Sequence, residues 1–378
     1  MTYGGVIAGS GTFTKAGLGG TLVLTGSNTF TGGLATFGGG FVEVSADANL
    51  GAVPATLKPD AIALANSGSS GRMRFTESFT MPATRGITIN VGGTLGGYFE
   101  VAADKTLTIA GPVTGGGQLR KTGSGALVLS GSSSYAGTTT VSSGTLTVSG
   151  VVTGTAGVSV IGGATLVLAS PGALATRSVT SSTGAKVTLA PYLETAVGGL
   201  AATAGGLTDV QNGKLTVIAG LSATDLVTAL VAGRNGGTWD GTSGITSTVT
   251  AAQVANFEMR AVGWMDNGDG SLTAAYAAQG DTNLDWVVDI LDVSNFVSSG
   301  KFGTGEPATW MDGDFNYDGV VDIQDVADFS ATGLYGAGSY NSPPGIAAVP
   351  EPAGVGVLAA LGLAAWGSLR RRAGGAAR

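Results

Sequence analysis

The sequence predicts a mainly β protein whose strand-rich part is followed by a small helical domain. Glycine supplies 67 of the 378 residues and charged residues only 11%, a composition typical of short strands joined by tight turns. A glycine-rich pattern of short strands occurs at residues 9–44 and again at 115–148. Two acidic twelve-residue segments, 281–292 and 314–325, lie near the C-terminus.

Composition and charge exclude several classes of function. The chain has no His and no Cys, which excludes Ser-His-Asp triads, thiolate nucleophiles and most zinc or iron sites. The net charge of −7 comes from the acidic stretch 281–328, because residues 1–280 carry equal numbers of acidic and basic side chains. No basic stripe is present, so we predict no nucleic-acid partner.

The N-terminal repeats predict a stacked β structure. Each copy places a lysine, Lys15 or Lys121, before a strand in which Leu alternates with other residues and before a glycine-containing turn. Such period-2 runs place their apolar side chains on one face. One copy cannot bury that face alone, so the copies must stack on neighbouring coils.

These copies, TKAGLGGTLVLTGSNTFTGG and RKTGSGALVLSGSSSYAGTT, resemble the autotransporter-associated β-strand repeat. The resemblance covers about residues 4–170, and we assign 1–170 to this first domain. It implies a right-handed parallel β-helix with aliphatic ladders inside and glycine at the bends. The repeat marks a fold and export, and it implies no catalytic activity.

Region 171–279 is expected to be β-rich. The segments GLAATAGG, LTDVQNGKLTVIAG and FEMRAVGWMDNGDGSLTAAYAA favour strands. We interpret Asp266–Gly270 as a hairpin turn between two of these strands. The alternative for this DNGDG segment is a third ion site.

One short helix is expected within residues 221–236 of this region. Ser222 is the predicted N-cap and Gly233 the predicted stop. Three residues at helical spacing are expected to face the core, namely Leu226, Leu230 and Val231.

The two acidic segments predict calcium-binding loops. Each places oxygen-bearing side chains at positions 1, 3, 5, 9 and 12: Asp281, Asn283, Asp285, Asp289 and Asp292 in the first, and Asp314, Asn316, Asp318, Asp322 and Asp325 in the second. Position 7 adds a backbone carbonyl, from Val287 or Val320. Calcium takes six to eight oxygen ligands, and without a cation the clustered carboxylates repel one another. The alternative is a pair of acidic surface loops with chance spacing.

The tandem segments GDTNLDWVVDILDVSNFVSSG and GDFNYDGVVDIQDVADFSATGL resemble a type I dockerin domain, here assigned to 280–335. The resemblance implies two Ca²⁺ sites, each followed by a short helix, and a cohesin-like partner for the helical faces of 290–299 and 323–333. Position 6 of the second loop is Gly319, as the sharp turn requires. The first loop has Trp286 there, so we expect its site to be weaker.

The C-terminal segment predicts membrane attachment. Residues 336–348 form a Gly-, Ser- and Pro-rich linker that we expect to be exposed and unpaired. Seventeen uncharged residues, 353–369, then precede three arginines, Arg370, Arg371 and Arg372. A helix of that length spans about 25 Å, and the arginines favour the cytoplasmic side. The alternative is a buried C-terminal helix.

With Pro350, Glu351 and Pro352, segment 349–378 resembles a PEP-CTERM sorting signal. The resemblance implies an exosortase-type enzyme as partner, a membrane helix, and export to the cell envelope or release after processing. Residues 1–13 lack the features of a signal peptide, so we expect such a signal upstream of Met1. The combination of repeats, dockerin-like pair and tail resembles planctomycete surface proteins.

These features favour a non-catalytic envelope or extracellular protein in which a β-helix stalk carries a calcium-stabilised module. One alternative is a β-helix polysaccharide lyase or hydrolase. A glycosidase needs two carboxylates facing each other across a sugar, whereas those of 1–280 are scattered: Glu43, Asp47, Glu77, Glu100, Asp104 and Glu194. Another is a cohesin-binding component of an extracellular complex, and an extracellular polysaccharide is a further possible partner.

Overall fold

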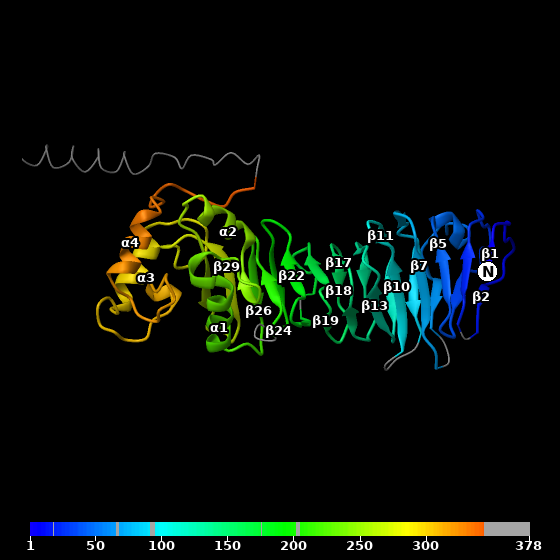
Figure 1. Cartoon of the computed structure of the whole chain (residues 1–378), viewed down its shortest axis with the longest axis horizontal. Helices are drawn as coiled ribbons and strands as arrows, with labels where there is room; N and C mark the ends of the chain where they lie inside the picture. The colour runs from blue at the N-terminus through cyan, green and yellow to red at the C-terminus, as the bar shows by residue number, and fades with distance from the viewer. Residues whose placement is uncertain (18, 66–67, 91–94, 175, 202–204, 344–378) are drawn as a thin grey trace, which may run out of the picture.

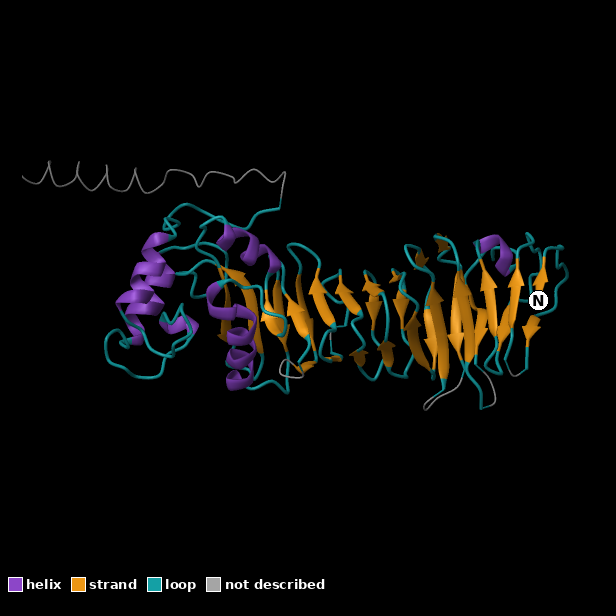
Figure 2. Ribbon diagram, in the orientation of Figure 1, coloured by secondary structure: helices purple, strands orange, loops and turns teal. Residues whose placement is uncertain are grey.

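The computed structural model describes residues 1–17, 19–65, 68–90, 95–174, 176–201 and 205–343. These residues form an elongated β-solenoid that ends in a helical part (Figure 1). The strands run across the long axis, and the α-helices gather at the C-terminal end, while one short 3₁₀ helix, η1 (Asp47–Leu50), lies near the N-terminal end (Figure 2). The predicted mainly β architecture is therefore confirmed.

Successive coils of the solenoid stack in parallel sheets. A ten-stranded sheet takes one strand from each successive coil, which gives about ten turns: β1 (Thr2–Tyr3), β3 (Thr21–Leu24), β5 (Phe41–Val44), β7 (Gly71–Phe75), β10 (Gly96–Val101), β13 (Gln118–Thr122), β16 (Thr139–Val141), β19 (Val158–Val160), β21 (Ser178–Ser181) and β24 (Gly199–Ala201). An eight-stranded sheet forms a second face: β8 (Phe79–Met81), β11 (Thr106–Ile109), β14 (Ala126–Leu129), β17 (Thr145–Val148), β20 (Thr165–Leu168), β22 (Lys186–Leu189), β25 (Leu207–Asp209) and β27 (Gly244–Thr246). A five-stranded sheet contains β2 (Phe13–Lys15), β4 (Leu34–Thr36), β6 (Lys58–Leu64), β9 (Arg85–Ile89) and β12 (Val113–Gly115), and a two-stranded sheet contains β15 (Ser132–Ser133) and β18 (Val151–Val152).

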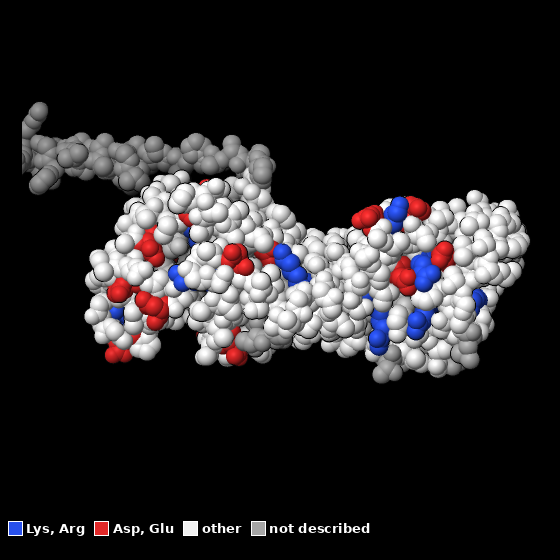
Figure 3. Space-filling view, in the orientation of Figure 1, with Lys and Arg blue, Asp and Glu red and all other residues white. Residues whose placement is uncertain are grey.

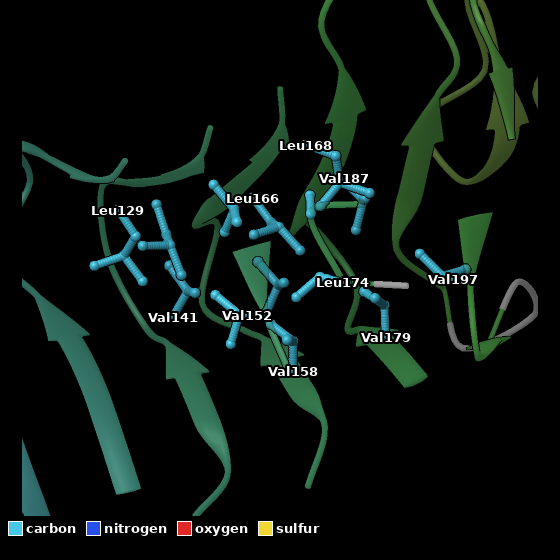
Figure 4. Close-up of a cluster of buried hydrophobic side chains, with 14 of the residues drawn as sticks. Leu129, Val141, Val152, Val158, Leu166, Leu168, Leu174, Val179, Val187 and Val197 are labelled. Carbon is cyan, nitrogen blue, oxygen red and sulfur yellow. The ribbon is translucent and has the colours of Figure 1, made fainter. Parts of the chain in front are cut away.

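The core is a set of aliphatic ladders along the solenoid axis. Leu129, Val148, Leu168 and Leu189 are in register on neighbouring strands, and all four are buried. Figure 4 shows Leu129 and Leu168 with other aliphatic side chains that fill the interior. Because successive strand residues point to opposite faces, alternate positions are buried, as the period-2 pattern predicts.

The lysine that both repeats share holds a turn. Lys121 is fully buried and its Nζ donates to the backbone carbonyls of Thr122, Gly123 and Ser143 at 2.8, 2.6 and 3.1 Å. Lys15 likewise donates to carbonyls of the turn that follows it. The lysine therefore satisfies acceptors that the strands leave unpaired at the bend.

The parallel sheets continue past residue 170, through β27. A four-stranded sheet then forms at the C-terminal end: β23 (Glu194–Val197), β26 (Lys214–Val217), β29 (Leu272–Ala277) and β28 (Ala261–Asp266). β29 pairs antiparallel with both β26 and β28. The turn between β28 and β29 is the predicted hairpin at 266–270.

Helix α1 (Ala223–Arg234) is the predicted short helix, with Ser222 as its N-cap. The predicted stop at Gly233 is wrong, because the helix ends in a left-handed C-cap at Asn235. Glycine is needed at 233 since a Cβ there would lie 1.8 Å from the carbonyl oxygen of Ile245.

Two further predictions for this region are wrong. Leu226 and Leu230 are buried, but Val231 is 47% exposed because it lies on the outer side of α1. A second helix, α2 (Thr248–Ala255), follows an N-cap at Ser247. Its sequence TVTAAQVA mixes Ala and Gln, which favour helix, with β-branched Thr and Val, which favour it less, so propensity alone does not predict this element.

The C-terminal sorting features, including Pro350–Pro352, the expected helix 353–369 and Arg370–Arg372, lie outside the described residues. Among the helices of the described ranges, none combines the length and apolar character needed to cross a bilayer.

Candidate functional site

The two acidic loops lead into short helices beyond the four-stranded sheet. The first runs into α3 (Ile290–Ser299) and the second into α4 (Ile323–Ala331). Each loop is preceded by a glycine that lies against the other helix. A Cβ at Gly280 would lie 2.2 Å from Phe329, and one at Gly313 would lie 2.4 Å from Phe296. The two halves therefore pack reciprocally through their apolar faces.

In the first loop, side-chain oxygens accept hydrogen bonds from the backbone of the same loop. Asp281 accepts from the N–H groups of Asp285 and Trp286 at 3.2 and 2.9 Å. Asn283 accepts from Asp285 at 3.0 Å, and Asp285 accepts from Val287 at 2.9 Å. These bonds wind the loop around the side chains at positions 1, 3 and 5.

The last two acidic residues of the loop also begin the helix. Asp289 is the N-cap of α3 and accepts from Leu291 N–H at 2.7 Å. Asp292 accepts from the N–H groups of Thr282 at 2.8 Å and Asp289 at 2.9 Å. Position 12 thereby ties the start of the loop to the first turn of the helix, where a negative charge is favourable.

The second loop repeats these contacts position by position. Asp314 accepts from Asp318 and Gly319, Asn316 from Asp318, Asp318 from Val320, Asp322 from Gln324, and Asp325 from Phe315 and Asp322, at 2.7–3.2 Å. The predicted side-chain oxygens of each loop thus take equivalent places in the two halves.

Burial places these carboxylates in an unfavourable electrostatic environment. Burial raises the pKa of Asp281 to about 7, and the neighbouring Asp292 contributes to the rise. Burial likewise raises the pKa of Asp314 to about 6, with Asp325 and Asp318 nearby. A buried carboxylate next to like charges favours the protonated form, and a bound cation would remove that penalty.

The donor set fits a hard divalent cation. It consists of oxygen atoms only, the type of ligand that calcium prefers. Within the described residues, no Lys or Arg forms an ion pair with a carboxylate of either loop. In the same ranges, no three His, Cys, Asp or Glu side chains are grouped so that they could hold a metal ion as they stand. An ionised carboxylate has two oxygens with about four acceptor sites, so the backbone hydrogen bonds of the loops leave acceptor sites for a cation.

Trp286, at position 6 of the first loop, adopts φ 69°, close to φ 88° at the equivalent Gly319. A tryptophan in this left-handed region carries backbone strain that glycine avoids. The indole N–H donates to the carbonyl of Tyr276 at 3.0 Å, and Lys214 lies 4.8 Å from the ring centroid. The tryptophan thus attaches the first loop to the solenoid end.

Residues of the second half also fix the loops to the four-stranded sheet. Trp310 is fully buried, and its indole N–H donates to the carbonyl of Asp281 at 2.7 Å. It lies on Gly263 of β28, where a Cβ would come within 2.6 Å of the ring. The Tyr317 hydroxyl donates to the carbonyl of Val262. The helical part is therefore docked on the solenoid.

Sequence reasoning missed the contact between Tyr340 and the first loop. Its hydroxyl donates to Asp281, and its backbone N–H donates to Trp286 at 3.0 Å. Asn341 is buried and bonds both the side chain and the carbonyl of Asn212. The expectation that this linker is exposed and unpaired is wrong at Tyr340 and Asn341, whereas Gly336, Ala337 and Ser339 are exposed. The sequence feature that could have indicated this contact is Tyr340 itself, a large aromatic residue within a Gly-, Ser- and Pro-rich stretch.

Five of the six solenoid carboxylates weighed as catalytic candidates form ion pairs, and the sixth, Asp104, forms none with the described residues. Glu43 and Glu100 flank Arg74, at 3.2 and 2.7 Å. Three others also have a cationic partner, in the pairs Asp47–Arg85, Glu77–Lys105 and Glu194–Lys214. Each of these contacts links neighbouring coils, which accounts for the side chains as structural.

Known proteins resemble parts of the chain. The Passenger-associated-transport-repeat family model matches residues 13–44 and 119–148, so both predicted repeats are confirmed. The adhesin BmaC autotransporter of Brucella suis biovar 1 (strain 1330) is 34% identical over 139 residues, which cover 36% of this chain and 4% of that protein. The chain thus spans a small part of this relative's length. No solved structure matches. The solenoid therefore carries autotransporter-associated repeats.

Proposed function

We propose that the protein is a non-catalytic surface or exported protein of adhesin-like type. The β-solenoid serves as a stalk, and a dockerin-like module with two calcium sites closes its end. Support for the stalk comes from the two matched repeats and the autotransporter relative. One observation carries the calcium proposal: both loops wrap the same backbone hydrogen bonds around buried carboxylates that have no cationic partner.

In this proposal calcium is held by the side-chain oxygens at positions 1, 3, 5, 9 and 12 of each loop and by the carbonyls of Val287 and Val320. The cation supplies positive charge that the clustered aspartates lack. Binding then stabilises the loops, the helices that follow them and their contacts with the sheet. A ligand at a hundredfold excess over its dissociation constant stabilises the folded state by about 2.7 kcal/mol.

Calorimetric titration of the full chain with calcium tests this proposal. Binding heat and a higher unfolding temperature of the module are expected, both absent with chelator present. Asp314→Asn should remove the tighter event, and Asp281→Asn the weaker one. Asp269→Asn is the matched control, because Asp269 lies in the β-hairpin turn and bonds Ser271. Equal titrations of wild type and both loop variants would contradict the proposal.

A partner protein of cohesin type is proposed for the helical faces. Ile290, Leu291, Val297 and Ile323 are 63%, 58%, 67% and 71% exposed, an amount of exposed aliphatic surface that favours a protein interface. Replacing Leu291 and Ile323 by Ser should abolish capture of a cohesin domain while calcium binding persists. If a cohesin domain still captures the double variant, these helical faces are not the binding surface.

Export and sorting are proposed from the repeats and from residues 349–378. In a bacterial host, the solenoid should be accessible to antibody on intact cells, and removal of 349–378 should move the protein from the envelope to the medium. Retention inside cells, with the solenoid protected from external protease, would contradict surface exposure.

A further inference from the structure

Aromatic and arginine side chains alternate in a row on the outer face of the ten-stranded sheet. The row consists of Phe41 in β5, Arg72 in β7, Tyr98 in β10 and Arg120 in β13, each in register with the next. All four are half-buried, and their neighbours along each strand face the core. The row therefore follows the solenoid axis across four coils.

Both guanidinium groups of this row lie against aromatic rings. The Arg72 guanidinium carbon lies 4.3 Å from the Tyr98 ring centroid and 5.6 Å from that of Phe41. The Arg120 guanidinium carbon lies 5.4 Å from the Tyr98 ring centroid, and the Arg120 side chain also donates to Gln118 Oε1 at 2.8 Å. With the residues that the structure describes, Arg72 forms no hydrogen bond and no ion pair. Its Nε is buried without a partner, so its terminal NH2 groups are the donors available to a ligand.

Sheet stability alone does not account for the row. The adjacent positions in the same register, Thr21 before it and Thr140 after it, carry small side chains of good strand propensity. Ordering arginine and aromatic side chains costs more conformational entropy than ordering threonine. The parallel row of Glu43, Arg74 and Glu100 is different, because its charges neutralise one another.

We propose that the aromatic–arginine row binds a linear acidic polysaccharide through carboxylate or sulfate groups. Figure 3 shows charged side chains gathered over the N-terminal coils, while the middle of the solenoid is almost free of them on this face. Arg72 and Arg120 are two strands apart, which is about 9.6 Å and comparable to the length of a disaccharide. Arginines held by stacking lose little entropy when they bind a planar anion.

Other polymers fit this surface less well. A continuous polyphosphate needs a basic stripe along its whole backbone, whereas this row supplies two arginines, Arg72 and Arg120. A protein interface needs an apolar centre, whereas guanidinium groups cover faces of the Phe41 and Tyr98 rings here. The row lies on β5 to β13, away from the acidic loops (Figure 1), so binding should be the same with calcium or chelator. The inference therefore goes beyond the proposed function and can fail separately from it.

Binding of the full chain to polygalacturonate, heparin and dextran, measured by surface interferometry at low salt, tests the proposal. Polygalacturonate presents carboxylates, heparin sulfates, and dextran no charge. Binding to at least one acidic glycan, weakened by salt, is expected. Arg72→Gln should weaken it about tenfold, because a charge-assisted contact is lost. Tyr98→Thr should weaken it by releasing both arginines.

The matched control is Lys105→Gln, which removes one positive charge from the eight-stranded sheet, where Lys105 pairs with Glu77. It should bind as wild type does, and circular dichroism should show that every variant is folded. Several results would overturn the proposal: no binding to either acidic glycan, equal binding to dextran or to single-stranded DNA, or equal losses in Lys105→Gln and Arg72→Gln.

Discussion

Replacing Trp310 by alanine should release the acidic loops from the solenoid end. Trp310 lies in a short 3₁₀ turn (Trp310–Asp312), is fully buried, and donates to the carbonyl of Asp281 at 2.7 Å. Its ring packs edge-on against Phe315, with centroids 5.0 Å apart. Loss of a buried tryptophan costs about 3–5 kcal/mol, and the Asp281 carbonyl loses its donor.

The cost should fall on docking, because in a solenoid each coil contacts only its neighbours. A loss of about 3 kcal/mol corresponds to roughly a hundredfold increase in opening. Amide hydrogen exchange measures that opening segment by segment. We expect exchange in 280–341 and in β28 and β29 to accelerate about a hundredfold, with strands β14 to β20 unchanged.

Two variants sharpen this test. Trp310→Phe keeps a ring but removes the donor, so it should accelerate exchange only about tenfold. Phe257→Ala, at a side chain that is 96% exposed, should change nothing. The reasoning is refuted if the Trp310→Ala module exchanges as slowly as wild type, or if the middle strands lose protection to the same extent.

Three further predictions concern single contacts. Burial lowers the pKa of Lys121 from 10.5 to about 8. Between pH 8 and 10.5 the unfolded chain therefore binds a proton that the folded chain does not, so thermal stability should rise with pH in this range. Lys121→Met should lack that rise. Gly233→Ala should lower the free energy of unfolding, measured in urea, by about 1–3 kcal/mol, because the added Cβ meets the backbone of Ile245. Val231→Ala, on the exposed side of the helix, should change this free energy by less than about 0.5 kcal/mol. Tyr340→Phe removes the hydroxyl that donates to Asp281 and should speed proteolysis within 336–343. Equal cleavage rates of the variant and the wild type would contradict this prediction.

The sequence alone determined the local features of this protein. Period-2 strands and glycine turns predicted stacked β coils, because side-chain alternation is a property of each strand by itself. The spacing of Asp281, Asn283 and Asp285 predicted their shared orientation, because a tight loop turns alternate side chains to one side. In the structure, the side-chain oxygens of Asp281 and Asn283 both accept a hydrogen bond from the Asp285 N–H.

Only the tertiary structure decided how the parts join. Tyr340 reaches Asp281 across 59 residues, and Asn341 reaches Asn212 across 129; no local pattern encodes such contacts. The aromatic–arginine row likewise exists only because stacking aligns Phe41, Arg72 and later residues that are irregularly spaced along the chain. The period-2 pattern of a strand determines which face a side chain occupies. The length of each coil determines which residue of the next coil lies beside it.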